Sequence, residues 1–78
     1  MDLLQHICDS EDAAEIIELV HDLGEPYKEV FMLRIFGECS FKQIADLFCK
    51  TDNWACVTYH RARNKVREKW RKNHGNSL

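Results

Sequence analysis

Apolar residues recur every three or four positions along most of this chain, which is the spacing of amphipathic helices rather than of strands. Four stretches have this spacing, and they run from about Glu11 to Leu23, from Pro26 to Gly37, from Ser40 to near Cys49, and from Thr51 or Asp52 to about Lys72. The pattern therefore predicts an all-α fold, a small bundle of about four helices with no β elements.

Local signals mark where these helices begin and end. Gly24 follows the first helix, at a position where a left-handed backbone costs glycine little. Pro26 suits the first position of the second helix, because its missing N–H would be unpaired there. Ser40 and Gln43 fit a capping box at the start of the third helix. The expected organisation is an N-terminal linker or fraying segment over 1–9, one domain over 10–72 and a disordered tail over 73–78.

Each predicted helix has apolar positions that we expect to face the core. In the first, third and fourth helices these are Ala13, Ile16, Ile17 and Val20, then Phe41, Ile44, Ala45 and Phe48, then Ala55, Tyr59, Ala62 and Val66. The second helix is apolar on more than one face, so it is either central to the core or offers a surface to a partner. The residues open to the second role are Met32, Leu33, Ile35 and Phe36. We expect Trp54 to pack against the third helix. Trp70 either folds back on the core or contacts a partner, and the sequence does not decide between the two.

The size and composition of the chain fit one small folded domain. It has 78 residues, of which 45% are hydrophobic, an ordinary value for a globular protein, and 31% are charged, a somewhat high value. This composition indicates a folded domain rather than a disordered segment. No apolar run reaches the length of about 18 residues that spans a membrane. The N-terminus lacks a basic segment followed by an apolar stretch, so we expect no signal peptide and a location in the reducing cytoplasm.

Charge is divided unequally between the two halves of the chain. Residues 1–38 carry ten acidic and two basic side chains, a formal charge of −8, whereas residues 39–78 carry nine basic and three acidic ones, a charge of +6. A basic half on a chain of net charge −2 is typical of a phosphate-binding face. The competing interpretation is a solvated basic helix with no ligand.

The four cysteines are Cys8, Cys39, Cys49 and Cys56, and none forms a CxxC pair. In a cytoplasmic protein such residues first indicate small, buried or half-buried apolar side chains. A zinc site is the alternative, because Cys56 and His60 share a helix face and Cys49 precedes them across a turn. Its fourth ligand would be one of Cys39, Cys8 and His6, none of which has a supporting spacing. We expect no cofactor and no metal.

The third and fourth predicted helices together fit a helix-turn-helix, a short helix and a longer basic helix joined by a tight turn. Small residues are needed where the two helices touch, and Ala45 and Ala55 occupy such places. Ile44 and Phe48 supply the flanking apolar contacts. The exposed N-terminal residues of the second helix then enter the major groove of DNA, which is about 12 Å wide.

Several segments of the chain resemble region 4 of sigma factors of the extracytoplasmic-function group. The resemblance covers about residues 22–70 and rests on four segments in the same order and spacing. These are Glu25-Pro26-Tyr27-Lys28-Glu29-Val30-Phe31-Met32-Leu33-Arg34, Ser40-Phe41-Lys42-Gln43-Ile44-Ala45, Asn53-Trp54-Ala55 and Val57-Thr58-Tyr59-His60-Arg61-Ala62-Arg63. The resemblance implies a monomeric domain that recognises the −35 element of double-stranded promoter DNA and contacts the β flap of the RNA polymerase core.

The resemblance also implies which residues meet these partners. Base contacts fall on Asn53, Cys56, Val57, His60 and Arg61, and phosphate contacts on Lys42, Lys50, Arg63 and Lys65. Contacts with the polymerase or an anti-sigma factor would use the apolar residues of the second helix. Many relatives have arginine where this chain has Cys56 and glycine where it has Cys49, which puts the sequence preference and the conformation of the turn in doubt. We expect no region 2 within these 78 residues, which are either an excised domain or a naturally short protein.

Other classes of function remain as alternatives. The chain shows no catalytic triad order, phosphate loop or paired acids in an apolar setting, so we expect that it is not an enzyme. A different helix-turn-helix regulator would dimerise and bind paired half-sites. A protein-interaction module would use the apolar second helix and the acidic half, with DNA contact secondary.

Overall fold

Helices make up the whole regular structure of the described residues. The structure, a computed structural model, describes residues 10–75 and the side chains of residues 13–75. It contains α2 (Ser10–His21), α3 (Tyr27–Ile35), α4 (Phe41–Phe48) and α5 (Asp52–Asn73), and no strand within that range. The prediction of a small all-α bundle of four helices is therefore confirmed. Residues 1–9 and 76–78, for which we predicted a linker and part of a tail, lie outside the described residues.

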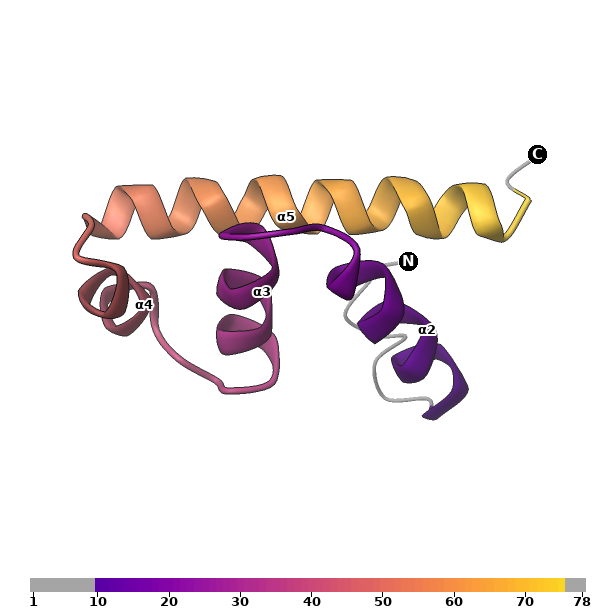
Figure 1. The fold of residues 1–78 in the computed structure, drawn as a ribbon, viewed down its shortest axis with the longest axis horizontal. Helices are drawn as coiled ribbons and strands as arrows, with labels where there is room; N and C mark the ends of the chain where they lie inside the picture. The colour runs from indigo at the N-terminus through magenta and orange to yellow at the C-terminus, as the bar shows by residue number, and fades with distance from the viewer. Residues whose placement is uncertain (1–9, 76–78) are drawn as a thin grey trace.

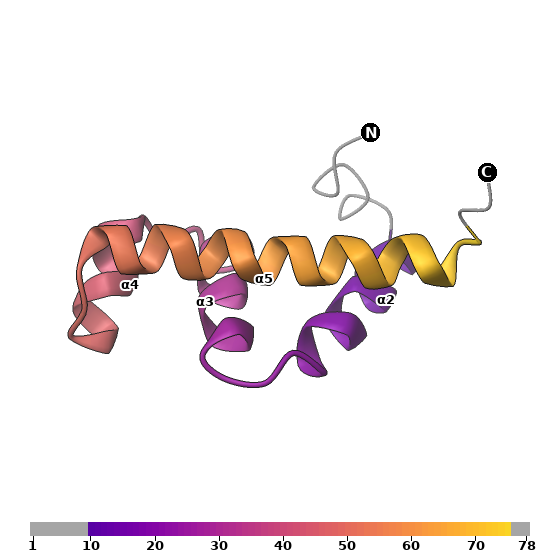
Figure 2. The same ribbon diagram turned by 90° about the horizontal axis from the view of Figure 1, so that it is seen from above.

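The longest helix, α5, is the element on which the others are assembled. Figure 1 shows α4 beside its N-terminal part, α3 beside its middle and α2 nearer its C-terminal part. Figure 2, turned by 90°, shows the same order along α5. All three shorter helices lie on one side of α5, and among residues 10–75 no helix covers the opposite side. No helix of this part of the chain is both long and apolar enough to cross a membrane.

The core lies between α5 and the three shorter helices. Its largest fully buried side chains are Phe31, Ile16, Ile44, Val20, Val30 and Val66. Phe31 of α3 stacks on Tyr59 of α5, with ring centroids 5.8 Å apart. The apolar second helix that the sequence predicted is thus central to the core through Val30 and Phe31.

One inward position was predicted wrongly. Ile17 is 42% exposed, whereas Leu19 is 8% exposed and takes its place in the core. Ile16, Leu19 and Val20 follow the three- and four-residue steps of a single face, and Ile17 lies about 100° around the helix from Ile16. Ile17 instead lines a small surface hollow with Met32 of α3.

The helix ends largely follow the predicted signals. Ser40 Oγ accepts a hydrogen bond from the Gln43 amide at 3.1 Å, and Gln43 Oε1 accepts one from the Ser40 amide at 2.8 Å, so the capping box is present. Thr51 caps α5 by accepting from the Trp54 amide at 3.1 Å. Gly24 has a φ of +80°, which is the left-handed conformation expected there.

Other boundaries differ from prediction by one or two residues. Helix α2 ends at His21 rather than Leu23, and α3 begins at Tyr27 with Pro26 as its N-cap. Helix α3 ends at Ile35 with Phe36 as its C-cap, and the left-handed residue that follows it is Glu38 rather than Gly37.

The C-terminal end of α5 is tied to α2. The helix continues through Asn73, and the ring of His74 stacks on Trp70 with centroids 4.0 Å apart. His74 Nε2 lies 3.1 Å from both carboxylate oxygens of Glu15 in α2. Trp70 is half-buried against the core, so the structure favours the core over a partner for this side chain.

The turn between α4 and α5 contains a strained residue. Cys49 has φ 57° and ψ 44°, a left-handed conformation, and its amide donates to the carbonyls of Ala45 and Asp46. This conformation costs a non-glycine residue about 1–2 kcal/mol.

The substitution Cys49→Gly is expected to stabilise the domain by about 1 kcal/mol, because glycine adopts a positive φ without strain. For a domain of this size, the gain raises the Tm by about 4–8 °C. Thermal unfolding followed by circular dichroism measures the change. Lys50→Gly is the matched control, because Lys50 has no positive φ, and it is expected to lower stability by about 0.5–1 kcal/mol. A loss of stability of the same size in both variants would contradict the strain at Cys49.

Candidate nucleic-acid interface

Helices α4 and α5 form a helix-turn-helix with a three-residue turn over residues 49–51. Ala45 and Ala55 are 1% and 0% exposed, in the core that the two helices share. The Lys50 amide donates to the Ala45 carbonyl at 2.9 Å. Phe48 and Trp54 meet across the turn with ring centroids 5.3 Å apart, which confirms the predicted packing of Trp54. These contacts fix the angle at which α5 leaves the turn.

The buried and exposed faces of α5 are clearly separated. Its buried residues are Ala55, Thr58, Tyr59, Ala62 and Val66. Four of the five predicted base-contacting residues are exposed on the other sides of the helix, namely Asn53, Val57, His60 and Arg61. The fifth, Cys56, is half-buried and lies nearer the core than the others. The structure thus brings these residues together over the first three turns of α5.

The ring of His60 packs on two aromatic side chains, those of Tyr59 and Phe41. Its ring centroid lies 5.4 Å from that of Tyr59, in an edge arrangement, and 6.4 Å from that of Phe41. Phe41 and Tyr59 are themselves 5.8 Å apart. The imidazole remains exposed, so its nitrogens are available to a ligand while the ring is restricted by its neighbours.

The predicted phosphate-contacting residues occupy different surroundings. Lys42 is exposed in the first turn of α4 and Lys50 in the turn that follows α4, where Lys50 Nζ lies 5.8 Å from the Trp54 ring centroid. Lys65 is directed towards α3, where its Nζ lies 5.3 Å from the centroid of Tyr27. Arg63 is half-buried, and its Nε is shielded from solvent. Of the four, Lys50 lies next to the start of α5 through its contact with Trp54.

Arg34 is a positioning residue that sequence reasoning missed. Its guanidinium lies 4.7 Å from the centroid of Phe41, and its Nη1 donates to the Cys39 carbonyl at 3.1 Å. These contacts join the end of α3 to the start of α4. The sequence alone does not predict these contacts, because a lone arginine on an apolar helix has many possible partners.

The predicted partner-binding cluster on α3 is divided by the fold. Met32, Leu33 and Ile35 are half-buried and pack against the core. Phe36, the C-cap residue, is 40% exposed. Of the four, Phe36 offers the most surface to another protein.

The zinc alternative finds no support in the described part of the chain. There, no three His, Cys, Asp or Glu side chains lie close enough together to hold a metal ion. The sulfur of Cys39 lies 3.8 Å from the Gly37 carbonyl oxygen, and Cys49 is exposed in the turn. Cys8 and His6, two of the suggested fourth ligands, lie outside the described residues.

The fold and this surface define a class, an all-α domain with a helix-turn-helix whose second helix is exposed along one side. No protein family, curated protein or solved structure matches the chain. The resemblance to sigma region 4 therefore remains a prediction that rests on the residues of this chain alone.

Proposed function

We propose that this domain binds double-stranded promoter DNA as region 4 of a sigma factor, recognising a −35 element and directing RNA polymerase in transcription initiation. The observation that carries the proposal is the exposed N-terminal face of α5, opposite the helix packing, with Asn53, Val57, His60 and Arg61 on it. A helix presented in this way by a helix-turn-helix fits the major groove. The proposed role is recognition, with no chemical step.

Each exposed residue has a matching partner on a base edge. The guanidinium of Arg61 donates two hydrogen bonds to O6 and N7 of guanine, and the amide of Asn53 pairs with N6 and N7 of adenine. Val57 packs on a thymine methyl group, and His60 donates to an acceptor in the groove. Cys56 is half-buried and contributes least to base reading.

Lysines beside this face supply the contacts that do not depend on sequence. Lys42 and Lys50 lie on and beside α4, where the first helix of the motif crosses the sugar–phosphate backbone. Arg63 is half-buried, and Lys65 is exposed but its Nζ lies 5.3 Å from the Tyr27 ring centroid, so both are less suited to the same role. Binding is expected to weaken steeply with salt, since each phosphate contact releases counterions.

The polymerase β flap and an anti-sigma factor are the protein partners of this proposal. Exposed apolar side chains favour such a contact on α2, where Ile17 is 42% exposed, and at the C-cap of α3, where Phe36 is 40% exposed. Leu47 of α4, 66% exposed, is a further apolar side chain on the surface. The second candidate function follows from the same observation, namely a protein-interaction module in which DNA contact is secondary.

The test is selection of duplexes from a random pool, followed by fluorescence anisotropy with the selected duplex and a scrambled version across a salt series. The parent domain is expected to prefer the selected duplex. Arg61→Ala should reduce that preference by about 5- to 150-fold, which corresponds to the loss of one bidentate base contact worth about 1–3 kcal/mol. Lys69→Ala, which removes a positive charge elsewhere on α5, should weaken binding to both duplexes slightly and leave the preference intact.

Two outcomes would contradict the proposal. An unchanged preference in Arg61→Ala would remove the base-reading role of α5. Absence of binding to any duplex at low salt, with retained binding to purified RNA polymerase core, would favour the protein-interaction module instead.

A further inference from the structure

The exposed side of α5 continues well past the residues that we assign to base reading. Steps of four and three residues along this side connect Asn53, Val57, His60, Asn64, Arg67 and Arg71, of which Arg67 is half-buried and the other five are exposed. Such steps keep residues on one face of a helix. Asn53, Val57 and His60 are uncharged or weakly basic, whereas Arg67 and Arg71 are positively charged, so this side becomes basic towards the C-terminus, with Glu68 beside it.

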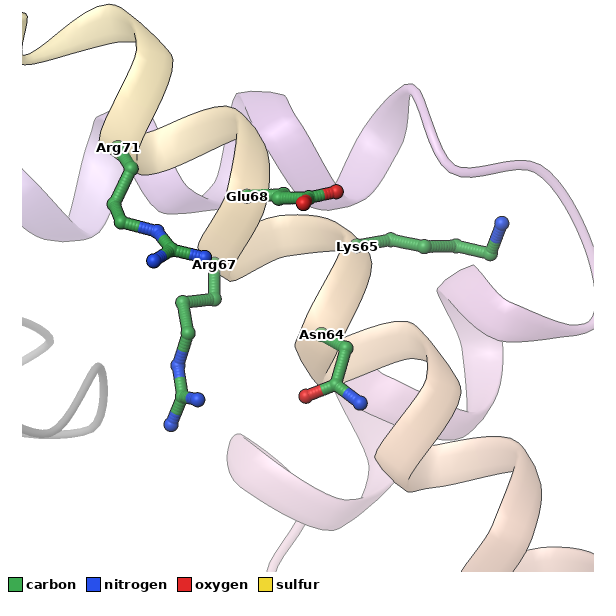
Figure 3. A pocket seen from close by; sticks show the side chains of 5 residues that line it. All are labelled: Asn64, Lys65, Arg67, Glu68 and Arg71. Carbon is green, nitrogen blue, oxygen red and sulfur yellow. The ribbon is translucent and has the colours of Figure 1, made fainter. Parts of the chain in front are cut away.

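Two arginines at the far end of this face line a shallow surface hollow of about 270 Å³, together with Asn64, Lys65 and Glu68. In Figure 3 the side chains of Asn64 and Arg67 extend to one side of α5, whereas those of Lys65 and Glu68 extend to another. Lys65 is engaged with the Tyr27 ring. Glu68 lines the hollow, but within residues 13–75 no ion pair joins it to Arg67 or Arg71.

In the domain without DNA, the spacing of Arg67 and Arg71 makes the interaction between their two positive charges unfavourable. Like charges four residues apart on a helix repel each other. Glu68 lines the same hollow, but among the described side chains no ion pair joins an acid to either arginine. The planar guanidinium matches two oxygens of one phosphate, which makes arginine more suitable than lysine for holding a backbone phosphate. A pair of such groups with a neighbouring amide at Asn64 is therefore suited to a polyanionic ligand.

The length of α5 sets where this ligand would lie. The helix has 22 residues and is about 33 Å long, whereas the major groove is about 12 Å wide. Arg67 and Arg71 lie roughly 10 and 16 Å along the axis from His60. When the N-terminal turns of α5 contact bases, residues at that distance would lie beyond those bases and next to the sugar–phosphate backbone at the edge of the groove.

We infer that Asn64, Arg67 and Arg71 form a second binding site on α5, which holds the sugar–phosphate backbone of DNA flanking the recognised element on one side. The site extends the proposed function and rests on it. It contributes affinity and fixes the orientation of the domain along the duplex, and it does not read sequence, because phosphates carry no base identity.

The test uses the selected duplex in three forms, one ending at the recognised element and two extended by one helical turn, about 10 base pairs, on one side or the other. The parent is expected to bind one extended form about 5- to 10-fold more tightly than the short one at low salt. In Arg67→Ala/Arg71→Ala this gain should disappear, the salt slope should fall by about 2, and the preference for selected over scrambled sequence should remain.

Lys69→Ala/Lys72→Ala is the matched control, because it removes the same charge from exposed positions of the same turns that lie off this face. It is expected to keep the gain from extension. Arg71→Ala alone should lose part of the gain, and it is the variant to use if the double arginine variant unfolds, since Arg71 is fully on the surface.

The outcomes separate this site from the proposed function. If the parent reads sequence through Arg61 but gains nothing from either extension, or if both double variants lose equally, the flanking site is wrong and the proposed function stands. If the parent binds no duplex, both are wrong. If the double arginine variant loses sequence preference, these residues read bases and the inference is overturned.

Discussion

Replacing Phe31→Ala is expected to lower the free energy of unfolding by about 3–5 kcal/mol. Phe31 is fully buried, is the largest of the completely enclosed side chains, and stacks on Tyr59 with ring centroids 5.8 Å apart. It is the main aromatic contact between α3 and α5. A domain of 78 residues has a total stability of roughly 4–12 kcal/mol, so the loss removes much or all of it.

Urea unfolding followed by circular dichroism measures this loss. The control is Phe36→Ala, the same substitution at a position only five residues away that is 40% exposed, and it should cost less than about 1 kcal/mol. Equal costs at the two positions would mean that Phe31 does not lie in the core and would contradict the packing of α3 on α5.

The second large effect is expected for Ala45→Asp, which places a carboxylate in the core between α4 and α5. Ala45 is 1% exposed, and its carbonyl already accepts from the amides of Cys49 and Lys50. Burying an unpaired charge costs several kcal/mol, because the lost hydration is not replaced. The helix-turn-helix is expected to melt first, since α4 has only eight residues and depends on this contact.

Leu47→Asp is the matched control for this change. Leu47 lies two positions away on the same helix and is 66% exposed, so the same new charge meets water there. We expect a cost below about 0.5 kcal/mol from Leu47→Asp and near-complete loss of DNA binding from Ala45→Asp. Stability close to that of the parent in Ala45→Asp would show that α4 and α5 do not pack through this residue.

The elements of the fold were predictable where a local signal agrees with the tertiary structure. Ser40 and Gln43 bring both halves of a capping box within three residues, so they fix the start of α4 without help from the rest of the chain. Gly24 marks a left-handed position in the same local way. Both signals act over one turn, which is why sequence alone identifies them.

Features that depend on packing were harder to predict. Ile17 fits the apolar stripe of α2 by spacing, but the contact with α5 selects Ile16, Leu19 and Val20 instead. The choice between these neighbouring faces depends on how α2 crosses α5, which periodicity does not specify. The contact between His74 and Glu15 joins residues 59 positions apart, so no local sequence pattern predicts it.

The candidate site shows the same division. The exposure of Asn53, Val57, His60 and Arg61 follows from the helical spacing of the buried positions between them, so the sequence sufficed for these four. The half-buried state of Arg63 depends on its neighbours in space. The positions of Arg67 and Arg71 on the same side of α5 also follow from this spacing, whereas the hollow beside them depends on how the side chains pack.

The most direct test of the account is to map the DNA-binding surface by NMR, titrating the 15N-labelled domain with the selected duplex and recording amide shift changes. The account predicts the largest changes over residues 53–61 of α5 and in the turn at Cys49 and Lys50, with small changes in α2. Changes concentrated around Ile17 and Phe36, with α5 unaffected, would contradict the claim that the exposed face of α5 is the surface that binds DNA.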